Sequence, residues 1–224
     1  MHNSDESSVI REVLTAGYLQ TAKDVSNTNI NIQFSGTTLV GCLMLNTKLF
    51  CANLGDSRAV IAKQKNGDFI PCPLSKDHKP DDNVEMERIL SHGGRVETYR
   101  DIYGNQVGPY RVWLKHENIP GLAMARSIGD LVAASVGVIA EPEIFEFDLK
   151  EEDKFMVIAS DGVWEFLSNR QVINMIVPYY QKNQLELACE KVIKEATLRW
   201  KKEDEVIDDI TCVIVGLNIP PKTA

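Results

Sequence analysis

The chain has 224 residues, of which 44% are hydrophobic and 25% are charged, and a formal net charge of −8 at pH 7. This length supports one large domain with its own core, and the composition is ordinary for a soluble globular protein. The negative charge argues against a nucleic-acid partner, and no apolar run approaches the roughly 20 residues of a membrane span.

Five cysteines lie mostly within apolar runs, and none forms a Cys-x-x-Cys pair. They are Cys42, Cys51, Cys72, Cys189 and Cys212. The odd number favours buried free thiols in a reducing compartment over disulfides. Because the start, MHNSDESSVI, lacks the basic and apolar regions of a signal peptide, we expect a cytoplasmic or nuclear protein.

The first third of the chain predicts one helix followed by a β-meander. Ser4 and Asp5 can cap a helix over about residues 6–24, where apolar residues recur at helical spacing. The strands that we expect next span residues 37–45, 49–55, 57–63 and 69–75. The turn at 46–48 joins the first two strands into a hairpin, and the turn at 64–68 joins the last two. In the second turn, Asn66-Gly67 is a strong hairpin signal.

The remaining elements begin with a helix that Pro80-Asp81-Asp82 opens and Gly93-Gly94 ends. Residues 95–120 mix Gly, Pro and aromatic residues and predict an irregular excursion on the surface, before a short helix at 122–127. The elements that we expect after it are strands at 143–149 and 154–160, helices at 169–181 and 184–202, and a strand at 209–217. Strands therefore come in a run and helices come late, which is an α+β order that favours two packed sheets with helices outside.

Acidic residues stand at the ends of several predicted strands. Asp161 directly follows the buried strand FMVIAS, Asp56 lies in a tight turn between two strands, and Asp208 and Asp209 precede the last strand. If the residues after Asp161 form a helix, Glu165 returns to the same face as Asp161.

Each acid alone has a structural explanation, because Asp is also typical of turns, helix caps and solvated strand starts. Together they suggest carboxylates converging on one rim of a sheet sandwich, where hard cations such as Mg²⁺ and Mn²⁺ find oxygen ligands. No His/Cys cluster has zinc spacing, and neither a Gly-x-x-x-x-Gly-Lys phosphate loop nor a Gly-x-Ser-x-Gly elbow occurs.

Eight short motifs, taken in order and with their spacing, are typical of one family. They lie at residues 35–38 (SGTT), 55–59 (GDSRA), 74–80 (LSKDHKP), 93–96 (GGRV), 120–130 (PGLAMARSIGD), 141–144 (EPEI), 159–169 (ASDGVWEFLSN) and 208–215 (DDITCVIV). Over roughly residues 8–217 the sequence resembles the metal-dependent protein phosphatases of the PP2C type. The resemblance implies a four-layer α/β/β/α sandwich of two antiparallel sheets, in agreement with the α+β order.

The resemblance also implies a reaction and a set of ligands. PP2C phosphatases hydrolyse phosphoserine and phosphothreonine in proteins, with two Mg²⁺ or Mn²⁺ ions and a bridging water. Asp161 and Asp208 match ligands of the core metals, and Asp56, Asp161 and Glu165 match a weaker third site. At position 165 the family more often has Asp. Residues 95–120 match the flap beside the active site, and a full-length protein of this kind is expected to be a monomer.

The chain also departs from the family. It lacks the early Arg, the Glu-Asp pair and the Asp-Gly-His-Gly motif, and with them the first strands and the first helix of the fold. In the family that Asp bridges both metals, that His is a candidate general acid and that Arg grips phosphate. His78 matches a different motif, and we expect it to support a loop.

Two interpretations of this departure compete, and both treat residues 1–224 as a single partial phosphatase domain. We favour a fragment of an active phosphatase, weak or inactive by itself, because Asp56, Asp161, Glu165 and Asp208 look like a site that is kept. The alternative is a complete but inactive pseudophosphatase, a scaffold that binds phosphoproteins or other partners without hydrolysis. A phosphatase of small molecules on the same fold is a third, less favoured interpretation.

Overall fold

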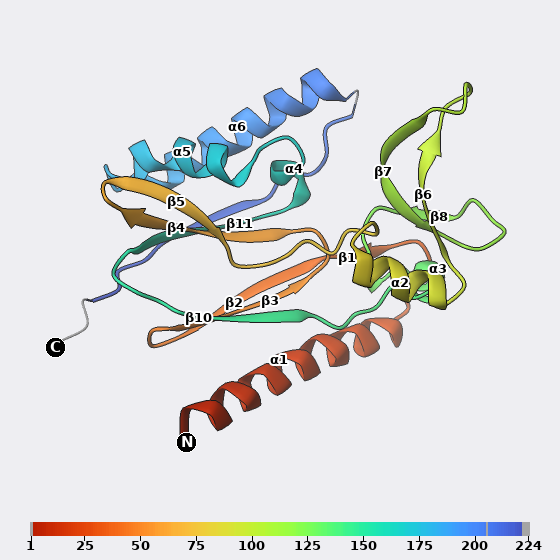
Figure 1. The fold of residues 1–224 in the computed structure, drawn as a ribbon, viewed down its shortest axis with the longest axis horizontal. Coiled ribbons are helices and arrows are strands. Elements are labelled where there is room, and N and C mark those ends of the chain that lie inside the picture. Colours follow the sequence, from red (N-terminus) through yellow and green to blue (C-terminus); the bar gives the residue numbers. More distant parts are fainter. Residues whose placement is uncertain (1, 205, 221–224) are drawn as a thin grey trace. The chain divides into compact units, whose positions relative to one another are not determined.

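The computed structural model describes residues 2–204 and 206–220 (Figure 1). The side chains of residues 2–5 are not described. The chain divides into two compact units. The first comprises Met1–Leu39, Asn53–Asp56 and Asp77–Ile144, and the second comprises Val40–Ala52, Ser57–Lys76 and Phe145–Ala224.

The first unit carries three small groups of elements. They are the helices α1 (His2–Ser26), α2 (Asn83–Ser91) and α3 (Leu131–Ala134), the strand pair β1 (Gly36–Thr37) and β9 (Ile128–Gly129), and the sheet β6 (Arg95–Arg100), β7 (Gln106–Trp113) and β8 (Pro120–Leu122). The predicted first helix is confirmed, but it begins at His2, so Ser4 and Asp5 lie inside α1 and do not cap it. The helix α2 is capped as its sequence suggests, because the Asp82 side chain accepts a hydrogen bond from the Val84 N–H.

Two predictions in this unit are wrong. Residues 95–120 are not irregular, since β6 and β7 pair antiparallel and the Tyr99 ring packs edge-on against Trp113 with centroids 5.0 Å apart. The expected helix at 122–127 is absent from this described segment: the Ala125 N–H donates to the His78 carbonyl instead of to a carbonyl of its own turn. A short helix forms only at α3, after Asp130.

The second unit is built on two antiparallel sheets. One has the order β10 (Glu143–Asp148), β3 (Lys48–Leu54), β2 (Leu39–Leu45), and the other has the order β12 (Cys212–Gly216), β11 (Asp153–Ala159), β4 (Arg58–Lys65), β5 (Asp68–Pro73). Both predicted hairpins are confirmed. At the second turn Asn66 and Gly67 have positive φ angles of 53° and 89°, as a two-residue β-turn of this kind requires.

Two hydrophobic cores hold this unit together. Between the sheets, Leu49 of β3 meets Ile61 of β4 and Met156 of β11. The helices α5 (Asn169–Tyr180) and α6 (Leu185–Glu203) cover the outer face of the four-stranded sheet (Figure 1). Phe155 and Val157 of β11 pack in the core beneath these helices. The predicted α+β fold with packed sheets and outer helices is therefore confirmed.

Candidate metal site

The strand β11 holds Asp161 at a fixed place. Phe155, Met156 and Val157 are buried in β11, which pairs on one side with β12 and on the other with β4. Asp161 begins the short helix α4 (Asp161–Trp164) and is half-buried. Asp161 therefore lies two residues beyond the end of a strand that is paired on both sides.

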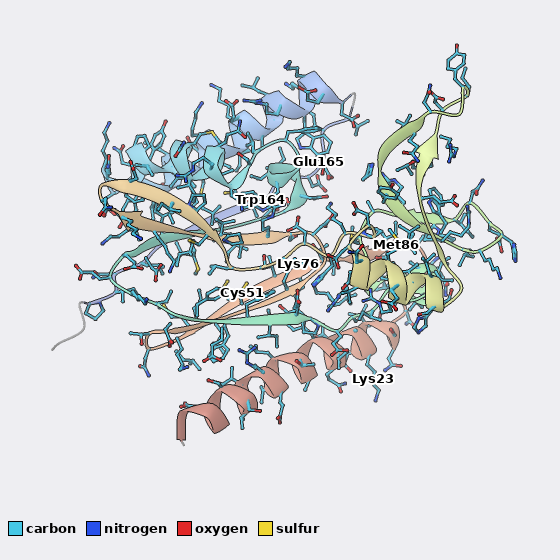
Figure 2. All side chains as sticks on the ribbon, in the orientation of Figure 1. Lys23, Cys51, Lys76, Met86, Trp164 and Glu165 are labelled. Carbon is cyan, nitrogen blue, oxygen red and sulfur yellow. The ribbon has the colours of Figure 1, made fainter. Side chains whose placement is uncertain are left out.

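Helix α4 is anchored by aromatic side chains, one of which is Trp164, labelled in Figure 2. The Trp164 indole N–H donates to the Ala159 carbonyl at 2.9 Å, and the Arg58 guanidinium lies 5.2 Å from the centre of the Trp164 ring. Trp164 is 6% exposed and belongs to the hydrophobic core of the second unit. From α6, the Trp200 indole N–H donates to the Gly162 carbonyl at 2.7 Å.

Glu165 follows α4 directly, and its backbone N–H donates to the Asp161 carbonyl at 2.8 Å. This hydrogen bond closes one helical turn, so the predicted helical return from Asp161 to Glu165 is confirmed. The Glu165 side chain is exposed.

The segment after β11 is fastened to the segment before β12. The Ser160 hydroxyl donates to the Asp209 carbonyl at 3.1 Å and accepts from the Thr211 N–H at 3.0 Å. The Ser160 N–H also donates to the Thr211 carbonyl at 3.1 Å. Residues about fifty positions apart in the sequence, including the neighbours of Asp161 and Asp208, are therefore held in contact.

Gly162 makes this approach closer still. A Cβ atom built on Gly162 would lie 2.4 Å from the Asp209 carbonyl oxygen, so only glycine fits at this position without a shift of the backbone. The exposed Asp208 carboxylate accepts a hydrogen bond from the Asp209 N–H at 2.8 Å. The side chains of Asp161, Glu165 and Asp208 can offer a metal ion only oxygen atoms, and oxygen ligands are the ones that Mg²⁺ and Mn²⁺ prefer.

Within the residues that the structure describes, no group of three or more His, Cys, Asp or Glu side chains is gathered as it would be around a metal ion. The assignment of Asp56, Asp161, Glu165 and Asp208 as metal ligands therefore stays a prediction. Asp161, Glu165 and Asp208 belong to the second unit, and Asp56 belongs to the first.

Asp56 is fixed by two successive residues of the LSKDHKP motif. The Gly55 N–H donates to Nδ1 of His78 at 3.0 Å, and the His78 N–H donates to the Gly55 carbonyl at 3.0 Å. Lys79 then reaches Asp56 with 2.5 Å between Nζ and Oδ2, although Asp56 is only 2% exposed. His78 therefore supports the Gly55-Asp56 turn, in line with the expected loop-supporting role.

Sequence reasoning missed a buried ionic cluster in the first unit. Glu85 of α2, 3% exposed, accepts a forked set of bonds from Arg126 at 2.5–3.1 Å and a further bond from Arg88 at 2.6 Å. Burial would raise the pKa of Glu85, but the hydrogen bonds from Arg126 and Arg88 outweigh it and hold this pKa below its usual value. The available signal was the position of Glu85, which lies one turn before the buried Ile89 on the same helix face.

Comparison with known proteins gives one consistent family. The family model described as protein phosphatase 2C matches residues 2–204. The chain is 39% identical over 193 residues to a probable protein phosphatase 2C 12 of Oryza sativa subsp. japonica, covering 85% of this chain and 48% of that protein. A probable protein phosphatase 2C 35 of Arabidopsis thaliana is 32% identical over 217 residues, covering 91% of this chain and 62% of that protein.

Solved structures agree on the fold. The serine-threonine phosphatase 2C from Toxoplasma gondii superposes with a TM-score of 0.77 at 17% identity, over 93% of this chain and 67% of that chain. The chain spans about half the length of curated relatives that it matches. In the described part of the chain, no helix combines the length and apolar character needed to cross a membrane.

Proposed function

The chain belongs to the protein phosphatase 2C family, and from this premise we propose that it is the larger part of a domain that hydrolyses phosphoserine and phosphothreonine in proteins. The matched residues 2–204 run through both compact units, which supports one PP2C-like domain across residues 1–224. The observation that carries the proposal is the contact between residues 160–162 and 209–211, because it joins the two acidic motifs of the sequence.

We assign Mg²⁺ or Mn²⁺ as the cofactor. Asp161 and Asp208 would hold the core ions, and Asp56 with Asp161 and Glu165 would hold a weaker one. When bound, such ions supply Lewis acidity for the hydrolytic water and positive charge for the phosphoryl oxygens. The chain itself contributes rigidity, because β11, Ser160 and the Trp164 and Trp200 hydrogen bonds fix the backbone on both sides of Asp161.

The substrates are phosphorylated proteins, and the full-length protein acts as a monomer in the cytoplasm or nucleus. The five free cysteines fit a reducing compartment, and the net charge of −8 fits a protein that does not bind nucleic acid.

A second function is favoured by one specific feature of the sequence. Residues 1–224 contain no Asp-Gly-His-Gly motif, whose Asp bridges the metals in the family that the chain resembles. We therefore propose that this stretch alone turns over weakly or not at all. A pseudophosphatase that binds phosphoproteins without hydrolysis is the alternative.

Calorimetric titration of residues 1–224 with Mn²⁺ tests the assignment of the metal ligands independently of any phosphatase activity. We expect Asp161→Asn and Asp208→Asn each to weaken Mn²⁺ binding at least about tenfold, since each removes a charged ligand. Glu151→Gln, an exposed acid next to β11, is the matched control and leaves binding unchanged. Unchanged Mn²⁺ affinity in both Asp variants would refute the assignment.

Turnover is then measured on a phosphothreonine peptide with saturating Mn²⁺. Slow hydrolysis that Asp161→Asn abolishes supports the phosphatase. Tight peptide binding without any hydrolysis supports the pseudophosphatase.

A further inference from the structure

Two cysteines face each other across the first hairpin of the second unit. Strands β2 and β3 are joined by the two-residue turn Asn46-Thr47, so Leu45 opposes Lys48. Counting back from the turn places Cys42 opposite Cys51. In a hairpin of this kind the pair next to the turn is hydrogen-bonded and the pairs then alternate, which makes Cys42 and Cys51 a non-hydrogen-bonded pair.

This register suits a covalent bond between the two side chains. Cα atoms of a non-hydrogen-bonded antiparallel pair lie about 4.5 Å apart, and disulfides span Cα distances of about 4.4–6.8 Å. Both side chains point into the core between the sheets, where Cys51 packs with Leu49 and Ala59, and Cys42 packs against the same cluster. The two thiols are hydrogen-bonded to each other and are not oxidised.

The two thiols differ in exposure and in acidity. Cys51, labelled in Figure 2, is fully buried, whereas Cys42 is half-buried on β2, an outer strand of its sheet. The hydrogen bond from Cys51 lowers the pKa of Cys42 despite burial, and the same bond together with burial raises the pKa of Cys51. Cys42 is therefore the better nucleophile and Cys51 the protected partner.

We propose that Cys42 and Cys51 form a modification site, at which a peroxide oxidises Cys42 and Cys51 closes a disulfide. The Cys42 thiolate attacks one peroxide oxygen, the O–O bond breaks, and the leaving oxygen takes a proton; with hydrogen peroxide this gives a sulfenic acid and water. The Cys51 sulfur then attacks the Cys42 sulfur, the S–O bond breaks, and a second water leaves with the Cys51 proton. Two thiols are oxidised, one peroxide is reduced, and β2 becomes covalently fixed to β3.

The molecule contains a second thiol pair for comparison. Cys189 of α6 is hydrogen-bonded to Cys212 of β12, and burial together with Cys189 raises the pKa of Cys212 to about 12. These two thiols lie on a helix and a strand, so no strand register aligns them. Cys72 lies in the same core as Cys42, on β5. We expect peroxide to select Cys42 and Cys51 over these three.

Peptide mapping of the folded chain tests the site, and the result does not depend on phosphatase activity. The chain is reduced, exposed to hydrogen peroxide, alkylated and digested with trypsin, which cuts after Lys48 and so separates the two cysteines. We expect the disulfide between peptides 24–48 and 49–58 to form before any other. Because it restricts the conformations of the unfolded chain, it should raise Tm by about 3–8 °C.

Two variants make the outcome decisive. With Cys51→Ser, Cys42 should instead accumulate as sulfenic acid, which dimedone traps, while Cys72→Ser leaves the disulfide unchanged. The proposal is overturned if the Cys42–Cys51 link is missing while both thiols remain alkylatable in urea. It is also overturned if the link forms no faster in the folded chain than in urea, because the fold would then not position the pair.

Discussion

Lys79 and Asp56 form an ion pair of 2.5 Å between Nζ and Oδ2, which joins a carboxylate that is 2% exposed to a lysine side chain that is 30% exposed. The preceding residue, His78, binds both the N–H and the carbonyl of Gly55. His78 and Lys79 thus hold Gly55 and Asp56 in place. The predicted metal ligand Asp56 therefore already has a positively charged partner.

Replacing Lys79 with Met should therefore be costly. The substitution keeps the aliphatic stem but leaves a buried carboxylate without its lysine, so we expect the free energy of unfolding to fall by about 2–3 kcal/mol, less than for a fully buried pair because Lys79 reaches solvent. Urea denaturation measures the loss. Lys202→Met, which removes an exposed pair with Glu203, should change stability by less than about 0.5 kcal/mol. A loss for Lys79→Met as small as that of the control would contradict this account.

The same pair bears on metal binding. A divalent cation at Asp56 must compete with the Lys79 ammonium for the carboxylate, so we expect Lys79→Met to bind Mn²⁺ more tightly than the parent chain at the weaker site, by about tenfold. The Mn²⁺-induced increase in Tm should grow accordingly. An increase equal to that of the parent chain would show that Asp56 does not bind Mn²⁺ in competition with Lys79.

Glu85 should make stability depend on acid pH. The pKa of Glu85 in the folded chain is held below the unfolded value of about 4.3. The contribution of Glu85 to the free energy of unfolding is therefore complete above about pH 4.3 and is lost as the pH falls through the folded pKa. Glu85→Gln should lower the free energy of unfolding by about 2–3 kcal/mol at pH 7 and reduce the acid-induced loss of stability. Urea titrations between pH 3 and pH 7 test this, with the exposed Glu87→Gln as control; parallel curves for the parent chain and Glu85→Gln would contradict it.

Ser160 joins the ends of β11 and β12 through hydrogen bonds to Asp209 and Thr211. Ser160→Ala removes both side-chain bonds, and we expect a loss of about 1–2 kcal/mol in the free energy of unfolding and weaker Mn²⁺ binding. Ser135→Ala, which removes one exposed bond to the Val132 carbonyl, should cost clearly less. Equal losses would mean that the link adds nothing beyond an ordinary surface hydrogen bond.

Much of the second unit was predictable from the sequence, because its patterns are local. Strand-like runs flanking short turns predicted both hairpins, with Asn66-Gly67 as the stronger turn signal, and the apolar run before Asp161 predicted the buried strand β11. The first unit was less predictable. Residues 95–120 look irregular in composition, yet β6 and β7 pair through contacts such as that of Tyr99 with Trp113, which no local pattern encodes.

The candidate metal site likewise combines local features, which were predictable from the sequence, with long-range contacts, which were not. The positions of Asp161 and Glu165 followed from a strand and one helical turn, which are local features. The link between Ser160 and Asp209 joins residues 49 positions apart and needed the register of β11 with β12. The burial of Glu85 was likewise hidden, because its partner Arg126 lies 41 residues away.

Gly162 offers the sharpest test of the contact that carries the proposed function. The added methyl group of Gly162→Ala would lie 2.4 Å from a backbone oxygen of Asp209, which no side-chain rotation can relieve, so the two segments must separate. We expect a loss of about 2–3 kcal/mol in the free energy of unfolding, together with weaker Mn²⁺ binding. In the matched control Gly17→Ala, the new Cβ on the exposed face of α1 meets nothing within 4 Å, and helix propensity should raise stability by about 0.5–1 kcal/mol. If Gly162→Ala is as stable as the parent chain, the 160–162 and 209–211 segments are not packed as described. The proposal that Asp161 and Asp208 share one metal site then loses its support.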